Sequence, residues 1–184
     1  MTTKIAFFTV IITLLASCNN VELNQQLAKV PADSLIANIT KYCNTKVEIE
    51  GVIIHICGVD GKKIKLQTES GAIIKIVPHH SLERFDGSFN KKRVKVQGIV
   101  TELRVEIPYI DSLENEKALL CHIDHTPCKD SAWVNQKKRT GVADSLSKRG
   151  ILKLKQKMEQ TQKSYVSVIT ITAEKCEIAV EVAK

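Results

Sequence analysis

Histidine and cysteine side chains occur in two groups whose spacing suits metal or thiol chemistry. His55 and Cys57 are two residues apart, so on a β-strand both side chains would project from the same face. Four further candidates fall within eight residues: Cys121, His122, His125 and Cys128. Imidazole and thiolate together form the mixed ligation that suits zinc, with Cu(I) and haem iron as less suitable occupants. One hypothesis is therefore a zinc site built from His55, Cys57 and a pair from the second group.

A second interpretation of the same residues needs no metal. Cys121 and Cys128 are close enough in sequence to form a disulfide in an oxidising compartment. His55 and Cys57 would then be ordinary residues of a buried strand. The spacing matches no strict zinc motif such as paired Cys-x-x-Cys, which favours the disulfide or packing interpretation. Cys43 and Cys176 are expected to pack in the core or to pair with each other.

The first residues of the chain have the pattern of an export signal. Lys4 precedes an apolar run, Ile5 to Leu15, that is too short to remain in a bilayer, because a spanning helix needs about 20 residues. The following Leu-Ala-Ser-Cys resembles the lipobox of bacterial lipoproteins. The resemblance implies removal of residues 1–17 as a signal peptide and acylation of Cys18 by fatty acids such as palmitate. Lipidation of Cys18 leaves five of the six cysteines, so the remaining thiols cannot all pair with one another.

Positive charge is concentrated in one segment of the chain. The formal net charge is +7, and residues 137–163 hold nine basic residues against two acids. In a membrane-tethered protein this segment indicates contact with lipid phosphates or another anionic envelope polymer, although charge runs are more commonly solvated helix faces. The residues expected to make the contact are Lys137, Lys138, Arg139, Lys148, Arg149, Lys153, Lys155 and Lys157.

The elements that would position these groups follow from the spacing of apolar residues. Helical spacing from Pro31 to Cys43 predicts a short helix, and helices are also expected from Asp111 to Leu120 and from Val142 to Gln162. Alternating spacing predicts strands over residues 46–57, 62–68, 72–77, 93–107 and 164–182. Mid-strand Gly51 and Gly98 predict strong bends, and a change of inward parity after Val100 predicts a bulge.

This order of elements predicts a mainly β fold of the α+β class. The expected architecture is a five-stranded OB-like Greek-key barrel with an N-terminal helix and further helices before the last strand. We expect a lipid-anchored tether at residues 18–30 and an OB-like domain at residues 31–184, with a helical insertion at residues 108–163.

A resemblance to a known group of proteins supports this architecture. The strings VEIEGVIIHICGVDGKKIKL and KRVKVQGIVTEL are similar to the core of small exported OB-fold (tRNA-anti-like) lipoproteins of the Bacteroidota. In that core a His-x-Cys closes the first strand and a Gly-Lys-Lys opens the second. The similarity covers residues 45–107, about a third of the chain, and excludes the Lys-rich stretch 129–163. It implies fold and location but no biochemical role.

The expected function is that of a membrane-tethered OB-fold binding module of the bacterial cell envelope, facing the periplasm from the outer or inner membrane. Its expected partners are the membrane, through the lipid anchor, and an anionic envelope lipid or polymer or a protein. The alternative is a metal- or redox-linked lipoprotein that uses the His/Cys groups, with zinc as cofactor. A basic OB fold also suggests nucleic acid, but export and an aromatic content of 4% argue against that partner. No nucleophile with a base and no phosphate loop stands out, so no enzymatic activity is expected.

Overall fold

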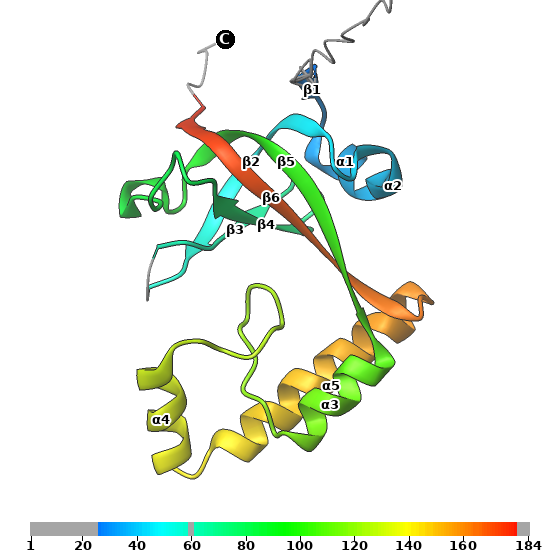
Figure 1. Ribbon diagram of the computed structural model, residues 1–184, viewed down its shortest axis with the longest axis vertical. Coiled ribbons are helices and arrows are strands. Elements are labelled where there is room, and N and C mark those ends of the chain that lie inside the picture. The colour runs from blue at the N-terminus through cyan, green and yellow to red at the C-terminus, as the bar shows by residue number, and fades with distance from the viewer. Residues whose placement is uncertain (1–25, 59–60, 180–184) are drawn as a thin grey trace, which may run out of the picture.

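A closed five-stranded β-barrel forms the centre of the protein (Figure 1). The computed structural model describes residues 26–58 and 61–179. The barrel strands are β2 (Lys46–Ile56), β3 (Ile64–Gln67), β4 (Ile73–Pro78), β5 (Arg93–Glu106) and β6 (Tyr165–Ile178). Their order around the barrel is β2-β3-β4-β6-β5; antiparallel pairing of β5 with β2 closes it, and β4 pairs with β6 in parallel. The expected OB-like barrel in a mainly β, α+β fold is thereby confirmed.

The segment before the barrel covers one end of its core. The expected helix at 31–43 is present as two short helices, α1 (Ala32–Ala37) and α2 (Ile39–Tyr42). They place Leu35, which is fully buried, and Ile39 against the barrel interior. A two-residue strand, β1 (Ala28–Lys29), pairs in parallel with β2 inside the range expected to be tether. The predicted signal peptide and the predicted lipidation site, Cys18, lie outside the described residues.

Strands β5 and β6 run beyond the barrel and take part in two separate hydrophobic cores (Figure 1). Val94, Val96 and Val100 of β5 face the barrel core, whereas Val105 belongs to the second core. The bulge expected after Val100 is absent: β5 pairs with β6 in continuous register from Gly98 to Glu106, and the one register shift lies earlier, between Gln97 and Gly98. The apolar residues of β5 thus change from even to odd positions because one face of the ribbon is buried at the barrel end and the opposite face is buried at the other end.

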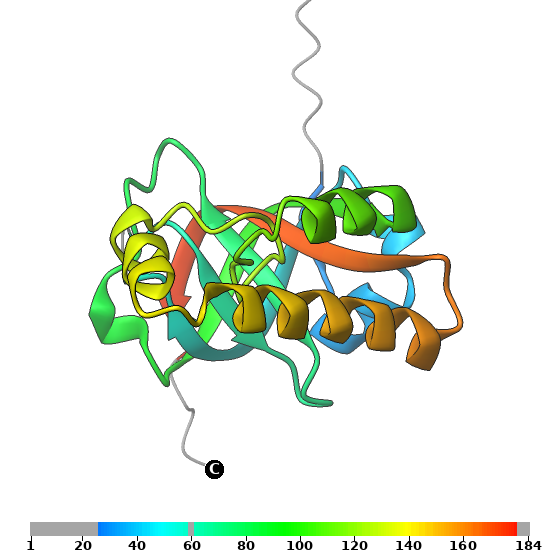
Figure 2. The same ribbon diagram turned by 90° about the horizontal axis from the view of Figure 1, so that it is seen from below.

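The second core lies between this ribbon and the helical insertion. Figure 2 shows α3 (Ile107–Asn115) and α5 (Ala143–Thr161) flanking the extended end of the ribbon. Helix α3 begins at Ile107 rather than at the expected Asp111, because Pro108 occupies its first turn, where proline is favourable, instead of only ending the strand. The sequence patterns did not indicate α4 (Ser131–Arg139), whose residues include no buried side chain.

The remaining connection, between β4 and β5, contains a single 3-10 turn, η1 (Gly87–Phe89). In the described part of the chain, no helix combines the length and the apolar composition that crossing a bilayer requires.

Candidate functional site

Residues 119–128 form a tight hairpin between the barrel and the insertion helices. The backbone amide of Cys121 donates to the carbonyl of Thr126 at 2.7 Å, and the amide of Cys128 donates to the carbonyl of Leu119 at 2.7 Å. His125, at the turn, has a positive φ of 58°. The Cys/His group of residues 121–128 therefore lies outside any helix. Helix α3 ends before it, and α4 begins after it, where Asp130 caps the amide of Trp133.

Asp124 anchors the hairpin to the outer face of β3 and β4. Its side chain is 2% exposed, and its Oδ2 accepts from the ammonium groups of Lys63 and Lys75, each at 2.9 Å. Its Oδ1 accepts from the hydroxyl of Thr126 at 2.8 Å. Burial alone would raise the pKa of Asp124, but the hydrogen bonds from Lys75, Lys63 and Thr126 outweigh it and hold the pKa well below its usual range.

Sequence reasoning selected the histidines on both sides of Asp124 but not Asp124 itself. Lys63, Lys65 and Lys75 project from the same outer face of β3 and β4, beside strand residues that point into the core. Lys65 and Lys75 are direct cross-strand partners. Like charges directly opposite each other are unfavourable, so such a face calls for a counter-charge. The facing lysines were therefore the feature of the sequence that could have indicated an acidic residue in the segment that covers β3 and β4.

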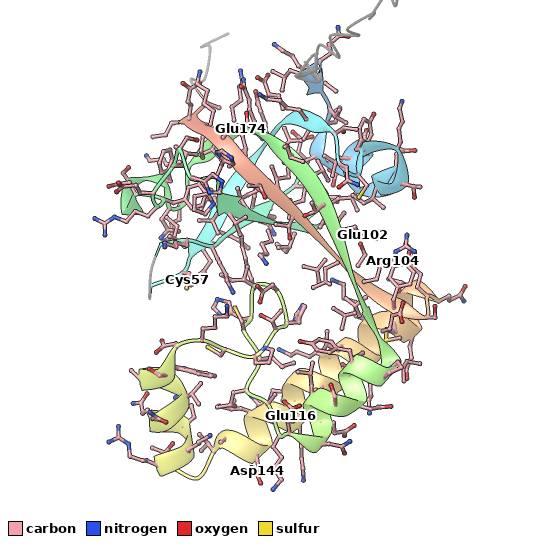
Figure 3. The ribbon with its side chains drawn as sticks, viewed as in Figure 1. Cys57, Glu102, Arg104, Glu116, Asp144 and Glu174 are labelled. Atoms are coloured by element: carbon pink, nitrogen blue, oxygen red, sulfur yellow. The ribbon has the colours of Figure 1, made fainter. Side chains whose placement is uncertain are left out.

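The structure brings part of the predicted His/Cys groups together. The rings of His55, on β2, and His122, in the hairpin, meet edge to face with centroids 4.4 Å apart. The amide of Cys57 donates to the carbonyl of Lys63 at 2.7 Å, and Cys121 also lies close to Lys63. Figure 3 shows Cys57 at the end of the barrel that faces the hairpin. The hairpin is thus held to the end of the first barrel strand, which is where the zinc hypothesis required it.

Among the described residues, the histidines and cysteines form neither a metal site nor a disulfide. Within residues 26–58 and 61–179, no three His, Cys, Asp or Glu side chains are arranged to hold a metal ion. The five cysteines of this region are Cys43, Cys57, Cys121, Cys128 and Cys176, and each is a free thiol, so the Cys121–Cys128 disulfide is not formed. Burial raises the pKa of Cys121, and burial followed by Glu177 raises that of Cys176 to about 11. At neutral pH both groups are therefore protonated thiols.

The histidines beside the hairpin are held in their neutral form. Burial, followed by the positive charges of Lys157 and Lys65, lowers the pKa of His125 to about 4. Burial and Lys65 also lower the pKa of His55 and of His122. The negative charge of Asp124 acts in the opposite direction and raises the pKa of His125, but Asp124 is already paired with two lysines. The site is therefore positively charged through its lysines and not through its histidines.

This environment predicts that the protein becomes less stable as the pH falls. A His125→Asn variant should show a weaker dependence of stability on pH. Below the ordinary pKa of 6.5 the unfolded chain binds a proton at His125, while the folded chain does not until about pH 4. The unfolded state thus binds more protons, and the free energy of unfolding should fall by up to roughly 3 kcal/mol as the pH drops through this window. Asparagine tolerates the positive φ of this position, so the variant should fold.

Urea denaturation of both proteins at about pH 7 and about pH 5 checks this expectation. The variant should lose distinctly less stability on acidification than the wild-type protein. The slope that remains should come mainly from His55 and His122, whose pKa values are lowered in the same direction. Equal losses of stability in the two proteins would contradict the assignment.

Two pockets flank the turn of the hairpin and share Lys65, His122 and His125. The smaller, of about 240 Å³, lies towards β4 and β6 and also includes Lys75 and Lys157 in its lining. The larger, of about 410 Å³, lies towards α4 and α5 and has a more apolar wall. That wall includes Leu119, Leu120, Trp133 and Leu146. Neither pocket has an aspartate or glutamate among its lining residues.

Larger hollows lie elsewhere on the surface. One of about 670 Å³ is lined by His79, His80 and charged residues of the β4–β5 connection, including Glu83 and Arg84. Another, of about 550 Å³, lies beside α1 and β2 and has charges of both signs in its lining. Neither contains a residue of the hairpin. The hairpin pockets are smaller, but their linings include His122 and His125 together with three of the predicted basic residues: Arg149, Lys153 and Lys157.

The basic residues predicted to contact an anionic surface differ from one another in their contacts. Lys155 is neutralised by Glu114 of α3 at 2.6 Å, and Lys137 lies over the ring of Trp133 at 5.9 Å. Arg149, Lys153 and Lys157 are spaced four residues apart on α5 and line the hairpin pockets. The other three side chains are exposed: Lys138, Arg139 and Lys148.

In comparisons with known proteins, no protein-family model and no curated protein matches this sequence. Functional inference for the chain therefore depends on its own residues and their arrangement.

Proposed function

We propose that the protein is a non-enzymatic binding module, anchored by lipid at Cys18 in the bacterial cell envelope and facing the periplasm. Its ligand site is the cleft between strand β3 and the helical insertion. One observation carries this proposal: the hairpin 119–128 is fixed across the outer face of β3 and β4 and leaves a pocket on each side of its turn.

The position of this cleft supports a binding role. OB-type barrels bind ligands on the face of their second and third strands, beside the loops that follow the first and fourth strands. In this chain those two connections are the loop between β2 and β3 and the insertion between β5 and β6. The salt bridge from Lys63 to Asp124 joins them directly. The cleft therefore occupies the usual binding face of the fold, although fold alone does not select the ligand.

A metal- or redox-linked function is the second candidate. The contact between His55 and His122, with Cys57 and Cys121 near Lys63, is the observation that favours it. Native mass spectrometry of the full chain after incubation with zinc would test this candidate. A mass increment of one zinc ion that is lost in a His55→Ala variant and on denaturation would support it, whereas an unchanged mass would leave binding in the cleft as the proposal.

The lipid anchor can be tested by metabolic labelling. The full chain, expressed in a Gram-negative host fed an alkyne fatty acid, should carry the label and appear in the membrane fraction. A Cys18→Ala variant should lose the label. Unlabelled wild-type protein in the soluble cytoplasmic fraction would contradict the proposed location.

Ligand binding in the cleft can be tested by hydrogen exchange on the purified full chain. Separate lipid, lipopolysaccharide and peptidoglycan fractions of the host envelope serve as probes, and a single-stranded oligonucleotide serves as a comparison that we expect to be inactive. Slower exchange of the amides of residues 119–128 and of β3 with one envelope fraction would support the site. Protection confined to other regions, or no protection with any fraction, would contradict it.

A further inference from the structure

The lysines around the hairpin differ in whether a carboxylate neutralises them. Lys63 and Lys75 share Asp124, and Lys155 pairs with Glu114. In contrast, four cations that line the two pockets form no ion pair with any residue of the described ranges: Lys65, Arg149, Lys153 and Lys157. Positive charge is thus left without a counter-charge in the pockets, while lysines on the same helix and sheet are neutralised.

The unpaired cations repel one another. Arg149, Lys153 and Lys157 follow at intervals of four residues on α5, which places like charges side by side on one helix face. Lys65 lies opposite Lys75 in the sheet, and the charges of Lys153 and Lys157 act on it across the cleft. An arrangement of this kind is unfavourable in the empty protein and becomes favourable when an anion enters.

Partial burial of two of these lysines makes their charged forms still less favourable. Burial lowers the pKa of Lys65 and also that of Lys157, although much of the Lys157 side chain remains exposed. Two acids contact residues that line the smaller pocket, but neither pairs with Lys65 or Lys157. Asp124 accepts from Lys75, a lining residue, and from Lys63. Glu102 accepts the hydroxyl of Ser167, a lining residue, at 2.6 Å and pairs with Arg104 at 3.0 Å. Glu102 is therefore already engaged by Ser167 and Arg104.

We propose that the smaller pocket binds a phosphate monoester between Lys65 and Lys157, and that the remainder of the ligand lies in the larger pocket beside Trp133. This assignment rests on the proposed function for the location of the cleft and adds the chemical class of the ligand. Asp124 shows the same principle inside the protein, since one oxyanion there joins two lysines of this face.

The chemistry of the lining favours phosphate over a single carboxylate. A phosphate monoester has three free oxygens and close to two negative charges, so it can accept from several ammonium groups that approach from different sides. Here the groups come from β3 and α5. The larger pocket has Trp133 and leucines in its wall, which suits an apolar or ring-shaped part of the same ligand. The phosphate could be that of a lipid headgroup or of a soluble phosphorylated molecule.

Fluorescence provides a direct test, because Trp133 is the only tryptophan of the chain and lines the larger pocket. The full chain in neutral detergent micelles is titrated with glycerol 3-phosphate as the soluble probe. In a parallel arm, the micelles contain phosphatidic acid or, for comparison, phosphatidylcholine. Sodium chloride at equal ionic strength measures nonspecific screening.

The informative variant is Lys65→Gln combined with Lys157→Gln. Its matched control is Lys148→Gln combined with Lys138→Gln, which removes the same charge from exposed positions on α5 and α4 that line neither pocket. We expect a saturable change in Trp133 fluorescence with a phosphate probe, weakened roughly tenfold or more in the first variant and little changed in the control. The first variant should fold, because it removes repelling, desolvated charges, and its melting temperature verifies this.

The arms also separate the possible outcomes. A response to glycerol 3-phosphate supports a soluble ligand, and a response to phosphatidic acid alone supports a lipid headgroup. No saturable response to either probe, or equal weakening in the two variants, overturns the phosphate assignment. If hydrogen exchange still shows protection of the hairpin by an envelope fraction in that case, the proposed function stands with a different ligand. If neither experiment responds, both proposals fail.

Discussion

An Asp124→Asn variant should be less stable than the wild-type protein by about 3 kcal/mol. The substitution keeps the size of the side chain but removes the charge that neutralises Lys63 and Lys75, at a side chain that is only 2% exposed. Two partly buried ammonium groups then face each other without a counter-ion. For a chain of this length the corresponding fall in melting temperature is about 6–12 °C. Thermal denaturation followed by circular dichroism measures it.

The effect should depend on burial and not on the loss of a carboxylate alone. Asp33→Asn is the matched control, because Asp33 is only partly buried and accepts the hydroxyl of Ser70 at 2.6 Å and its amide at 3.1 Å. Its replacement should cost no more than about 1 kcal/mol. Hydrogen exchange should also become faster in residues 119–128 of the Asp124 variant. Equal stability of the two variants would mean that Asp124 does not anchor the hairpin.

A Gly98→Ala variant should lose about 3 kcal/mol of stability or fail to fold. A β-carbon at this position would collide with the carbonyl oxygen of Thr172 and would lie 2.9 Å from the Cα of Ala173. Both obstacles belong to the backbone of β6, so no side-chain rotation can relieve the contact. The position coincides with the register shift between β5 and β6. Soluble yield and urea denaturation of the purified protein measure the effect.

Gly87→Ala is the control for this prediction. No heavy atom would lie within 4 Å of the new β-carbon at that position, apart from its neighbours in the chain. Its stability should remain within about 0.5 kcal/mol of the wild-type value. A Gly98 variant as stable as the Gly87 variant would show that β6 can move away from β5, contrary to the close approach seen between them.

The barrel could be predicted because its causes are local. Alternating apolar residues mark each strand, and mid-strand Gly51 and Gly98 mark the bends, so the strand pattern follows from the chain itself. The limits of the insertion were harder to predict. The proline at 108 was interpreted as the end of a strand, although it lies in the first turn of α3. Helix α4 has no buried residue and therefore no apolar stripe to reveal it.

The candidate site was predictable only in part, because its geometry depends on contacts between distant segments. The sequence identified His55 and His122 as residues that could meet, and they do. It could not show that the hairpin would be fixed by Asp124, since both lysines that hold it are about fifty residues or more away in the chain. Which of the many lysines remain unpaired likewise depends on the tertiary fold, as the contrast between Lys155 and Lys157 illustrates.

The ribbon formed by β5 and β6 passes from the barrel to the helical layer without interruption. Because both cores pack on the same two strands, one continuous β-ribbon joins the barrel to the helical layer. A movement that widens the cleft would have to bend or twist this ribbon. A ligand that contacts both the barrel and the insertion would oppose such a movement.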